Sequence, residues 1–322
     1  MNPGSPATLE SMLTMESSLK RLVRPSDPPR FRLTARDVAI LAACAQFRFL
    51  SSTQIAARVG GSPQQVVRRL QYLFAHAFLD RPPSQFVHLA AFVDGSFPLV
   101  YGLSGKGARL LREHGHQAGL DAAHLGQNNR SATAPFLAHT LETAQFVLDA
   151  EARCTDAGLA FLDQHRLIAT TMPPETQALR DPLRLQVSCL GPNRRPTTIA
   201  VIPDRLCSIV RGSERTNYAV EIDRGTERIK NKFSLKHYAY LEAWRQDAFK
   251  AQWNFQRMRV LTITTSTARI DNMITAQRAA TGETAPGLFL YTTSEKLAAE
   301  GLLAPIWKSA KAENVSLLAS GS

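Results

Sequence analysis

The sequence predicts an α/β protein in which a basic, helical N-terminal module precedes a mixed α/β sheet domain. Three observations support this fold class. Three short segments with helical periodicity occur early in the chain, and helices alternate with β-branched strands in its second half. The 322 residues, 44% hydrophobic and 20% charged, have the composition of a folded chain that is long enough for two cores.

The first 30 residues are rich in proline, serine and glycine and contain Pro3, Pro6, Pro25, Pro28 and Pro29. Such a composition cannot bury enough apolar surface to offset the entropy of ordering the chain. We therefore expect residues 1–30 to be a flexible tail that belongs to neither core.

Three helices follow the tail. The first is expected to begin after Thr34 as N-cap, with Asp37 in the third helical position. A second short helix is broken by Gly60 and Gly61, and a third begins with Pro63 at its first position, where a missing N–H costs nothing. Three helices with a glycine turn before the last one are typical of a helix-turn-helix.

Two strand-like runs lie beyond the third helix, at residues 86–90 and 97–101, and a turn at Asp94 and Gly95 separates them. A hairpin in this position forms the wing of a winged helix. Residues 31–115 are therefore predicted to form a winged-helix domain.

The winged-helix segment is strongly basic, since it carries ten Lys or Arg residues against four acids. On its third helix, the side chains predicted to face outward are Gln64, Gln65, Arg68, Arg69 and Tyr72. Gln and Arg make two-point contacts with adenine and guanine edges, and Arg also binds phosphate. This pattern predicts contact with double-stranded DNA, with a solvated amphipathic helix or a protein-binding helix as the alternatives. The net charge of +11 likewise favours a polyanionic partner.

A linker is expected at residues 116–133, which contain several Gly, Asn and Ser residues, and a second domain at 134–322. This domain should begin with a helix over 135–153 and a strand near 159–162, followed by an irregular, proline-containing stretch. The expected elements after that stretch are strands at 197–204, 206–210 and 217–223, a helix over 226–249, a strand at 259–265, a helix over 268–279, a strand at 287–292 and a helix over 294–302.

Carboxylates stand at the ends of two of these strands. Asp204 follows the first apolar run, and Glu221 and Asp223 end a later one. Because the two strands are expected to be neighbours, Asp204 and Glu221 should meet and hold Mg²⁺ or Mn²⁺, which prefer oxygen ligands. Asp223 should share the face of Glu221. The alternative is a metal-free cluster neutralised by Arg205 and Arg224.

These features resemble the PD-(D/E)xK nuclease superfamily and, more specifically, the replication-relaxation family of bacterial plasmids and mobile elements. The residues that carry the resemblance are the winged-helix segment 31–115, the helix bearing His139, the Pro203-Asp204 strand and residues 221–227. The resemblance implies a DNA-binding protein with a nuclease-like domain that acts in plasmid replication, topology or transfer.

One position departs from the nuclease pattern, which places a lysine two residues after the second acid. Here that position holds Asp223. Lys232 or Lys236, on the next predicted helix, could supply the missing ammonium group, unless both side chains extend to solvent. The departure favours a DNA-binding protein over a robust nuclease, and an active Mg²⁺-dependent endonuclease or nickase remains the alternative.

Several other functional classes have no support in the sequence. The four cysteines form no CxxC pair and are expected to be buried thiols, and no apolar run is long enough to cross a membrane. We therefore expect a cytoplasmic protein. The partners to consider besides DNA are a second copy of the chain and replication or transfer proteins.

Overall fold

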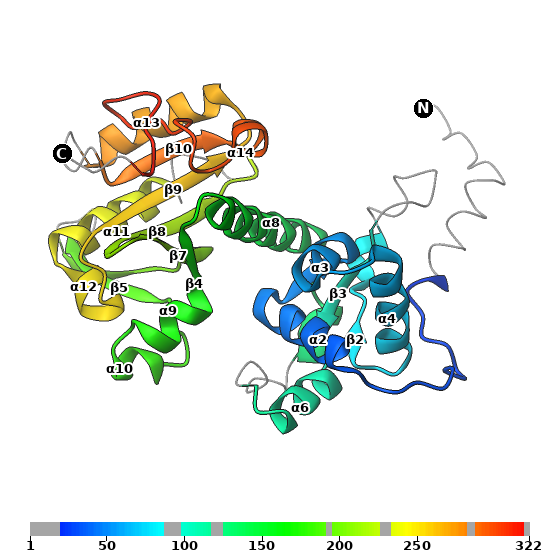
Figure 1. The fold of residues 1–322 in the computed structure, drawn as a ribbon. Helices are drawn as coiled ribbons and strands as arrows, with labels where there is room; N and C mark the ends of the chain where they lie inside the picture. The colour runs from blue at the N-terminus through cyan, green and yellow to red at the C-terminus, as the bar shows by residue number, and fades with distance from the viewer. Residues whose placement is uncertain are drawn as a thin grey trace, which may run out of the picture. The chain divides into compact units, whose positions relative to one another are not determined.

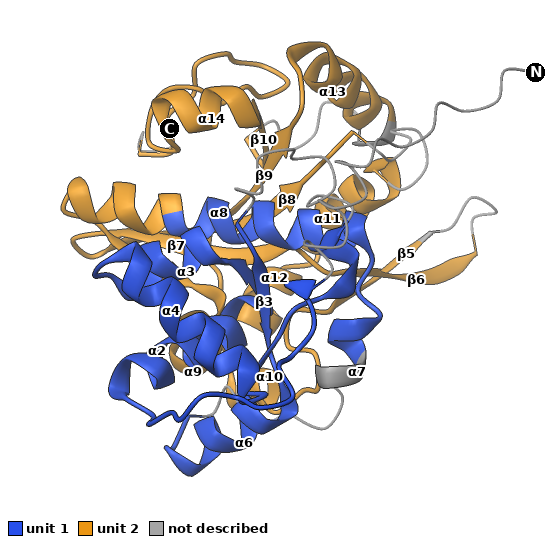
Figure 2. Ribbon diagram, turned by 90° about the vertical axis from the view of Figure 1, so that its right-hand side faces the viewer, with its two compact units in different colours: residues 1–148 blue, residues 149–322 orange. Residues whose placement is uncertain are grey.

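The computed structural model describes residues 20–86, 98–116, 125–190, 195–225, 233–281 and 287–318. It has a mixed α/β fold, as predicted, and divides into two compact units, residues 1–148 and 149–322 (Figure 2). The division falls inside the long helix α8 (Ala134–Asp156), downstream of the linker expected at 116–133. Part of that expected linker forms the short helix α7 (Leu125–Arg130).

The first unit begins with the three helices α2 (Ala35–Phe47), α3 (Ser52–Val59) and α4 (Pro63–Ala75). Thr34 and Asp37 form the expected capping box, and Pro63 opens α4. The apolar faces of these helices pack into a buried core that includes Ile40, Leu41, Ile55, Leu70 and Leu73. The helix starts follow from local capping chemistry, which the sequence carries directly.

A small antiparallel sheet with the order β1-β3-β2 completes the first unit (Figure 1). Its strands are β1 (Phe49–Ser51), β2 (Leu79–Asp80) and β3 (Val100–Leu103), and helix α6 (Gly105–Glu113) follows it. Most of the predicted wing hairpin, residues 87–97, lies outside the described residues. Phe86, where the first wing strand was expected to start, instead has helical backbone angles after the 3₁₀ turn η1 (Pro83–Gln85).

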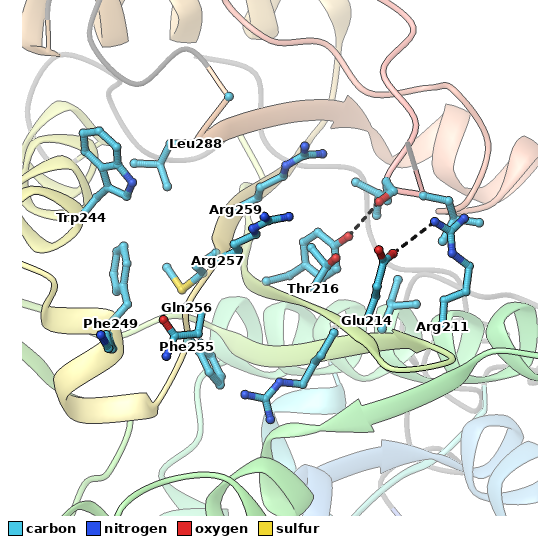
Figure 3. Close-up of a pocket in the computed structure, with 18 of the residues that line it drawn as sticks. Arg211, Glu214, Thr216, Trp244, Phe249, Phe255, Gln256, Arg257, Arg259 and Leu288 are labelled. Atoms are coloured by element: carbon cyan, nitrogen blue, oxygen red, sulfur yellow. Dashed lines mark hydrogen bonds and ion pairs between the residues drawn. The ribbon is translucent and has the colours of Figure 1, made fainter. Parts of the chain in front are cut away.

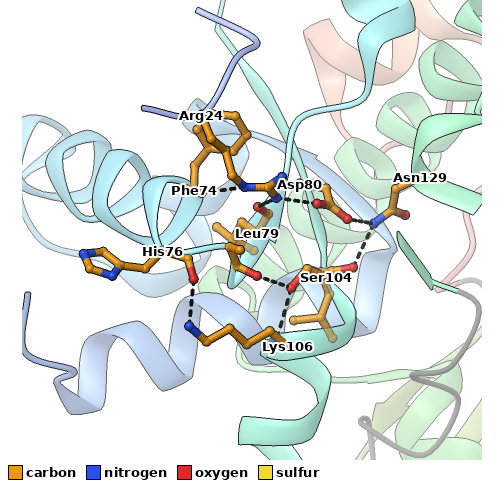
Figure 4. Close-up of polar contacts among 11 residues, drawn as sticks. Arg24, Phe74, His76, Leu79, Asp80, Ser104, Lys106 and Asn129 are labelled. Atoms are coloured by element: carbon orange, nitrogen blue, oxygen red, sulfur yellow. Dashed lines mark hydrogen bonds and ion pairs between the residues drawn. The ribbon is translucent and has the colours of Figure 1, made fainter. Parts of the chain in front are cut away.

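Residues 20–30, which the sequence placed in a flexible tail, are attached to the first unit through Arg24 (Figure 4). The Arg24 guanidinium donates to the carbonyl oxygens of Phe74 and Leu79, both at 2.9 Å, and to the Asp80 carboxylate at 2.6 Å. Asp80 also accepts a hydrogen bond from Asn129 at 3.0 Å. The Asp80 carboxylate therefore contacts both the N-terminal segment and α7.

The second unit is built on a five-stranded mixed sheet with the order β10-β9-β8-β7-β4 (Figure 1). Strands β8, β9 and β10 run parallel, whereas β7 and β4 are antiparallel to their neighbours. A tight turn at Gly212, which has a positive φ, joins β7 to β8. The strand bounds are β4 (Ala160–Asp163), β7 (Arg205–Arg211), β8 (Glu214–Ile222), β9 (Met258–Thr264) and β10 (Phe289–Thr293).

Helices cover one face of this sheet and enclose the main core of the unit. They are α11 (Ser234–Arg245), α12 (Ala248–Trp253) and α13 (Thr267–Thr281), and α14 (Ser294–Glu300) follows β10. Tyr240, Trp253 and Ile270 of the three covering helices share one buried cluster with Ala219 and Val260 of the sheet. The single helix predicted over 226–249 is wrong at its end, because Asp247 adopts a left-handed conformation that separates α11 from α12.

The stretch expected to be irregular contains regular structure that the sequence pattern did not indicate. It holds the helices α9 (Gln164–Thr170) and α10 (Pro174–Gln177) and the strand β5 (Leu185–Leu190). Strand β5 pairs only with β6 (Pro196–Val201), in a separate two-stranded sheet. The expectation that the strand ending at Asp204 lies beside the strand of Glu221 is therefore wrong, since β7 occupies that place.

The four cysteines are free and buried, as the sequence predicts. Among the described residues, no helix combines the length and the apolar character needed to cross a membrane.

Candidate functional site

Glu221 lies one residue before the end of β8, on the sheet face that α11 covers, and is only 8% exposed. Its Oε1 accepts a hydrogen bond from the Tyr240 hydroxyl at 2.5 Å, and its Oε2 forms an ion pair with the Lys236 ammonium group. Lys236 and Tyr240 are four residues apart and so share one face of α11. The structure therefore brings Lys236, which the sequence offered as a substitute lysine, to the second acid.

Asp204 directly precedes β7 and lies near the end of β8 that carries Glu221. The β7–β8 register pairs Arg205 with Val220, and the Asp204 N–H donates to the Val220 carbonyl oxygen at 3.1 Å. The Asp204 Oδ2 also accepts from the Ile222 N–H at 2.8 Å, which places this carboxylate at the end of β8. The Asp204 charge accordingly acts on both Glu221 and Tyr240. The two carboxylates are thus close enough to interact electrostatically, and Asp204 comes there through β7 and not through β6.

The Glu221 carboxyl group is in an environment that disfavours its charge. Burial, together with repulsion from Asp204, raises the pKa of Glu221 to about 7, although Lys236 and Tyr240 both act to lower it. The next strand adds a hydroxyl, because Thr262 pairs with Glu221 in the β8–β9 register and its buried Oγ1 has no hydrogen-bond partner in the structure. The site thus combines a carboxylate whose ionised form is disfavoured by burial with a buried hydroxyl oxygen, that of Thr262, which makes no hydrogen bond among the described residues.

Asp223 belongs to a different interaction. The Arg269 guanidinium of α13 binds it in a two-point ion pair, at 2.5 and 2.7 Å, and the Thr264 hydroxyl donates to it at 2.5 Å. The arginine that neutralises Asp223 is therefore neither of the two that the sequence suggested. Arg205 instead lies 3.3 Å from Asp163.

The candidate metal ligands Asp204 and Glu221 form a two-carboxylate pair. No group of three or more His, Cys, Asp or Glu side chains within the described ranges is arranged to hold a metal ion. Mg²⁺ usually keeps several water ligands and needs only one or two protein carboxylates, so the pair is sufficient in number, but Tyr240 and Lys236 engage both oxygens of Glu221 in this structure. A bound cation would also favour the ionised form of Glu221. Lys232, the other candidate lysine, lies outside the described residues.

The predicted DNA-contacting side chains lie on α4 in three different environments. Gln64, Gln65 and Arg68 are exposed. Arg69 is engaged within the unit, because its guanidinium forms a two-point ion pair with the fully buried carboxylate of Asp37. Tyr72 is half-buried against Phe31, with ring centroids 5.6 Å apart. Val67 of the same helix is 38% exposed although it is apolar.

Four of the predicted DNA-contacting side chains, Gln65, Arg68, Arg69 and Tyr72, border an open groove of about 630 Å³ in the first unit, whereas Gln64 does not line it. Five arginines and no acidic residue line it, and two of the lining residues are joined, since Arg36 donates to Gln65 at 3.1 Å. The lining residues are Arg30, Phe31, Arg32, Thr34, Arg36, Gln65, Arg68, Arg69 and Tyr72. Arg30, Arg32 and Arg36 were not predicted as site residues. Their close spacing, N-terminal to the basic helix α4, was a signal in the sequence that could have indicated them.

A model of the replication-relaxation family matches residues 41–257 of this chain, which include α4, Asp204, Glu221 and Lys236. No curated protein and no solved structure matches the chain at a significant level.

Proposed function

This chain belongs to the replication-relaxation family, and we propose that it binds double-stranded DNA through the basic groove of its first unit. The observation that carries the proposal is the convergence of five arginines without an acid around the exposed start of α4. We further propose that this binding serves the replication, topology or transfer of a plasmid or mobile element.

The groove offers two kinds of contact with a duplex. Gln64, Gln65 and Arg68 project from the first two turns of α4, where helix-turn-helix proteins read base edges. Arg30 and Arg32 lie on the segment before α2 and supply charge for the phosphate backbone. Gln65 and Arg68 thus line the same groove as Arg30 and Arg32.

Arg69 has another role in this proposal. Its guanidinium balances the buried Asp37 carboxylate and donates to the Arg32 carbonyl oxygen at 2.9 Å, so it holds α4 against α2 and the arginine-bearing segment. A variant at position 69 would therefore test folding as well as DNA contact. Arg36 and Arg68 are the better probes.

Duplex binding is tested by fluorescence anisotropy of a labelled DNA across a series of salt concentrations. Arg36→Ala combined with Arg68→Ala should weaken binding and reduce the slope of log K against log salt by about two, one unit for each phosphate group that is no longer neutralised. Arg112→Ala, which removes an exposed arginine of α6 outside the groove, is the matched control. Equal binding by both variants would rule out the groove.

A second candidate function is metal-dependent hydrolysis of a phosphodiester bond in the second unit, and the Lys236–Glu221 ion pair favours it. In the PD-(D/E)xK superfamily, the lysine two residues after the second acid offsets the charge that develops during the reaction and positions the attacking water. Lys236 brings an ammonium group to the same carboxylate from α11, while Asp204 and Glu221 are the oxygen ligands. Mg²⁺ or Mn²⁺, when bound there, would supply Lewis-acid activation of the phosphoryl oxygen.

Cleavage is tested with supercoiled plasmid in Mg²⁺ or Mn²⁺. Lys236→Met and Glu221→Gln should each abolish the nicked product of the wild type, whereas Lys296→Met, which removes an exposed lysine of α14, should not. Identical product from all four proteins would identify a contaminating nuclease. If none of the four produces nicked DNA, the second unit is not a nuclease under these conditions, and DNA binding stands alone.

A further inference from the structure

A pocket of the second unit lies at the opposite end of β8 from Glu221. Its volume is about 890 Å³, and its lining includes Thr216 near the start of β8, Trp244 of α11 and Arg257 and Arg259 at the start of β9 (Figure 3). Thr216 and Glu221 are five positions apart along β8, so the two places are roughly 17 Å apart along the strand. The pocket is distinct from the carboxylate pair.

Basic side chains outnumber acidic ones around this pocket. Five Lys or Arg residues line it against Glu214 and Asp247. Two of the five are engaged, since Arg211 pairs with Glu214 at 3.4 Å and Arg215 donates to Thr171 and to the Asn254 carbonyl oxygen. The remaining basic residues are Lys250, Arg257 and Arg259.

Arg259 is the most informative of these residues. Its Nη1 is buried and has no hydrogen-bond partner in the structure, and its charge acts on the Tyr218 hydroxyl, whose pKa burial raises. Within the described part of the chain, no carboxylate pairs with Arg257 or Arg259. A buried donor without an acceptor costs free energy, which an anionic ligand would recover.

Aromatic side chains line the same pocket as these arginines. Trp244 is 46% exposed, whereas Trp253 and Trp307 are fully buried. Figure 3 places Trp244 and Phe249 at one end of the pocket and Arg257 and Arg259 nearer its middle, with Leu288 between Trp244 and Arg259. An exposed tryptophan and unpaired guanidinium groups around one pocket are a combination with which proteins stack a base and bind its phosphate.

We propose that this pocket binds a nucleotide, with its base against Trp244 and its phosphate at Arg257 and Arg259. The volume lies within the range of small-ligand pockets. A free nucleotide and a nucleotide of single-stranded DNA present the same chemistry. The proposal is independent of duplex binding by the first unit, so either one can fail alone.

Intrinsic fluorescence tests the proposal, because Trp244 is the one exposed tryptophan of the three. The full chain is titrated with a short oligothymidylate, with ATP and with inorganic phosphate. A stacked base should quench Trp244, and Trp244→Phe should remove the quenching. Quenching by the oligonucleotide alone identifies single-stranded DNA as the ligand, and quenching by ATP alone identifies a free nucleotide.

Arg257→Gln combined with Arg259→Gln should lower the affinity for the ligand that quenches Trp244 at least tenfold. Arg180→Gln, which removes an exposed arginine outside the pocket, should leave this affinity unchanged. Thermal melts identify any variant that fails to fold. Arg36→Ala with Arg68→Ala should leave the quenching intact, which separates this site from the first-unit groove. Quenching that survives loss of both pocket arginines, an absence of quenching by any ligand, or equal responses to phosphate and ATP would each overturn the proposal.

Discussion

At the scale of single residues, Glu221 is defined by opposing influences. Lys236 and Tyr240 engage its two oxygens and favour the carboxylate, yet burial dominates and raises its pKa to about 7 from the ordinary 4.5. The group therefore changes charge near neutral pH. Its neighbour Asp223, two residues away, is held by Arg269 and belongs to the packing of α13.

The raised pKa of Glu221 predicts a pH-dependent loss of stability in buffer without divalent cations. Between about pH 4.5 and 7 the folded protein holds a proton that the unfolded chain has released, so the free energy of unfolding falls as the pH rises. Relative to Glu221→Gln, the wild type should lose on the order of 1 to 3 kcal/mol across this interval. Urea unfolding of both proteins at several pH values measures the difference, and parallel curves would contradict it.

Asp223→Asn should lower the free energy of unfolding without changing the contacts of Glu221 with Lys236 and Tyr240. The substitution leaves the mostly buried Arg269 guanidinium without its charge partner, which we expect to cost about 1 to 3 kcal/mol. Urea unfolding measures this cost. Asp271→Asn, at an exposed position on α13, the helix that carries Arg269, is the control. A nicking activity that disappears in Asp223→Asn at full stability would instead assign Asp223 to the catalytic site.

At the scale of elements, one buried carboxylate links α2 and α4. Asp37 accepts from the Thr34 N–H at 2.7 Å as part of the α2 cap, and it also pairs with Arg69 of α4. A helix cap and a long-range ion pair therefore share the same side chain, which helps to hold the predicted recognition helix against α2.

Neighbouring arginines of α4 should respond differently to substitution. Arg69→Ala leaves the fully buried Asp37 charge uncompensated and should cost about 3 to 5 kcal/mol. Arg68→Ala removes an exposed side chain and should change stability by less than about 0.5 kcal/mol. Chemical denaturation of the two variants distinguishes them, and equal stabilities would mean that the ion pair contributes little.

At the scale of the whole molecule, the two units offer separable chemistry. The first unit presents a groove of arginines, and the second a pair of carboxylates with a lysine. The net charge of +11 adds a general attraction for nucleic acid that weakens as salt rises.

This arrangement predicts a separation of functions on one DNA substrate. Glu221→Gln should retain duplex affinity within about twofold and an unchanged salt slope, because it removes no group that binds phosphate. Arg36→Ala with Arg68→Ala should weaken duplex binding while the carboxylate pair stays intact. Anisotropy and plasmid nicking on the same preparations test both, and a Glu221→Gln protein that no longer binds the duplex would show that the units do not act separately.

Features that depend on neighbours in the chain could be predicted from the amino-acid order. The starts of α2 and α4 follow from Thr34 with Asp37 and from Pro63, and β9 and β10 lie where their β-branched runs predict them. Folding in three dimensions was needed to place β6 outside the central sheet, to bring Lys236 to Glu221 and to pair Arg269 with Asp223. Strand pairing and ion pairs between distant residues depend on how the elements pack, and local patterns carry no record of that packing.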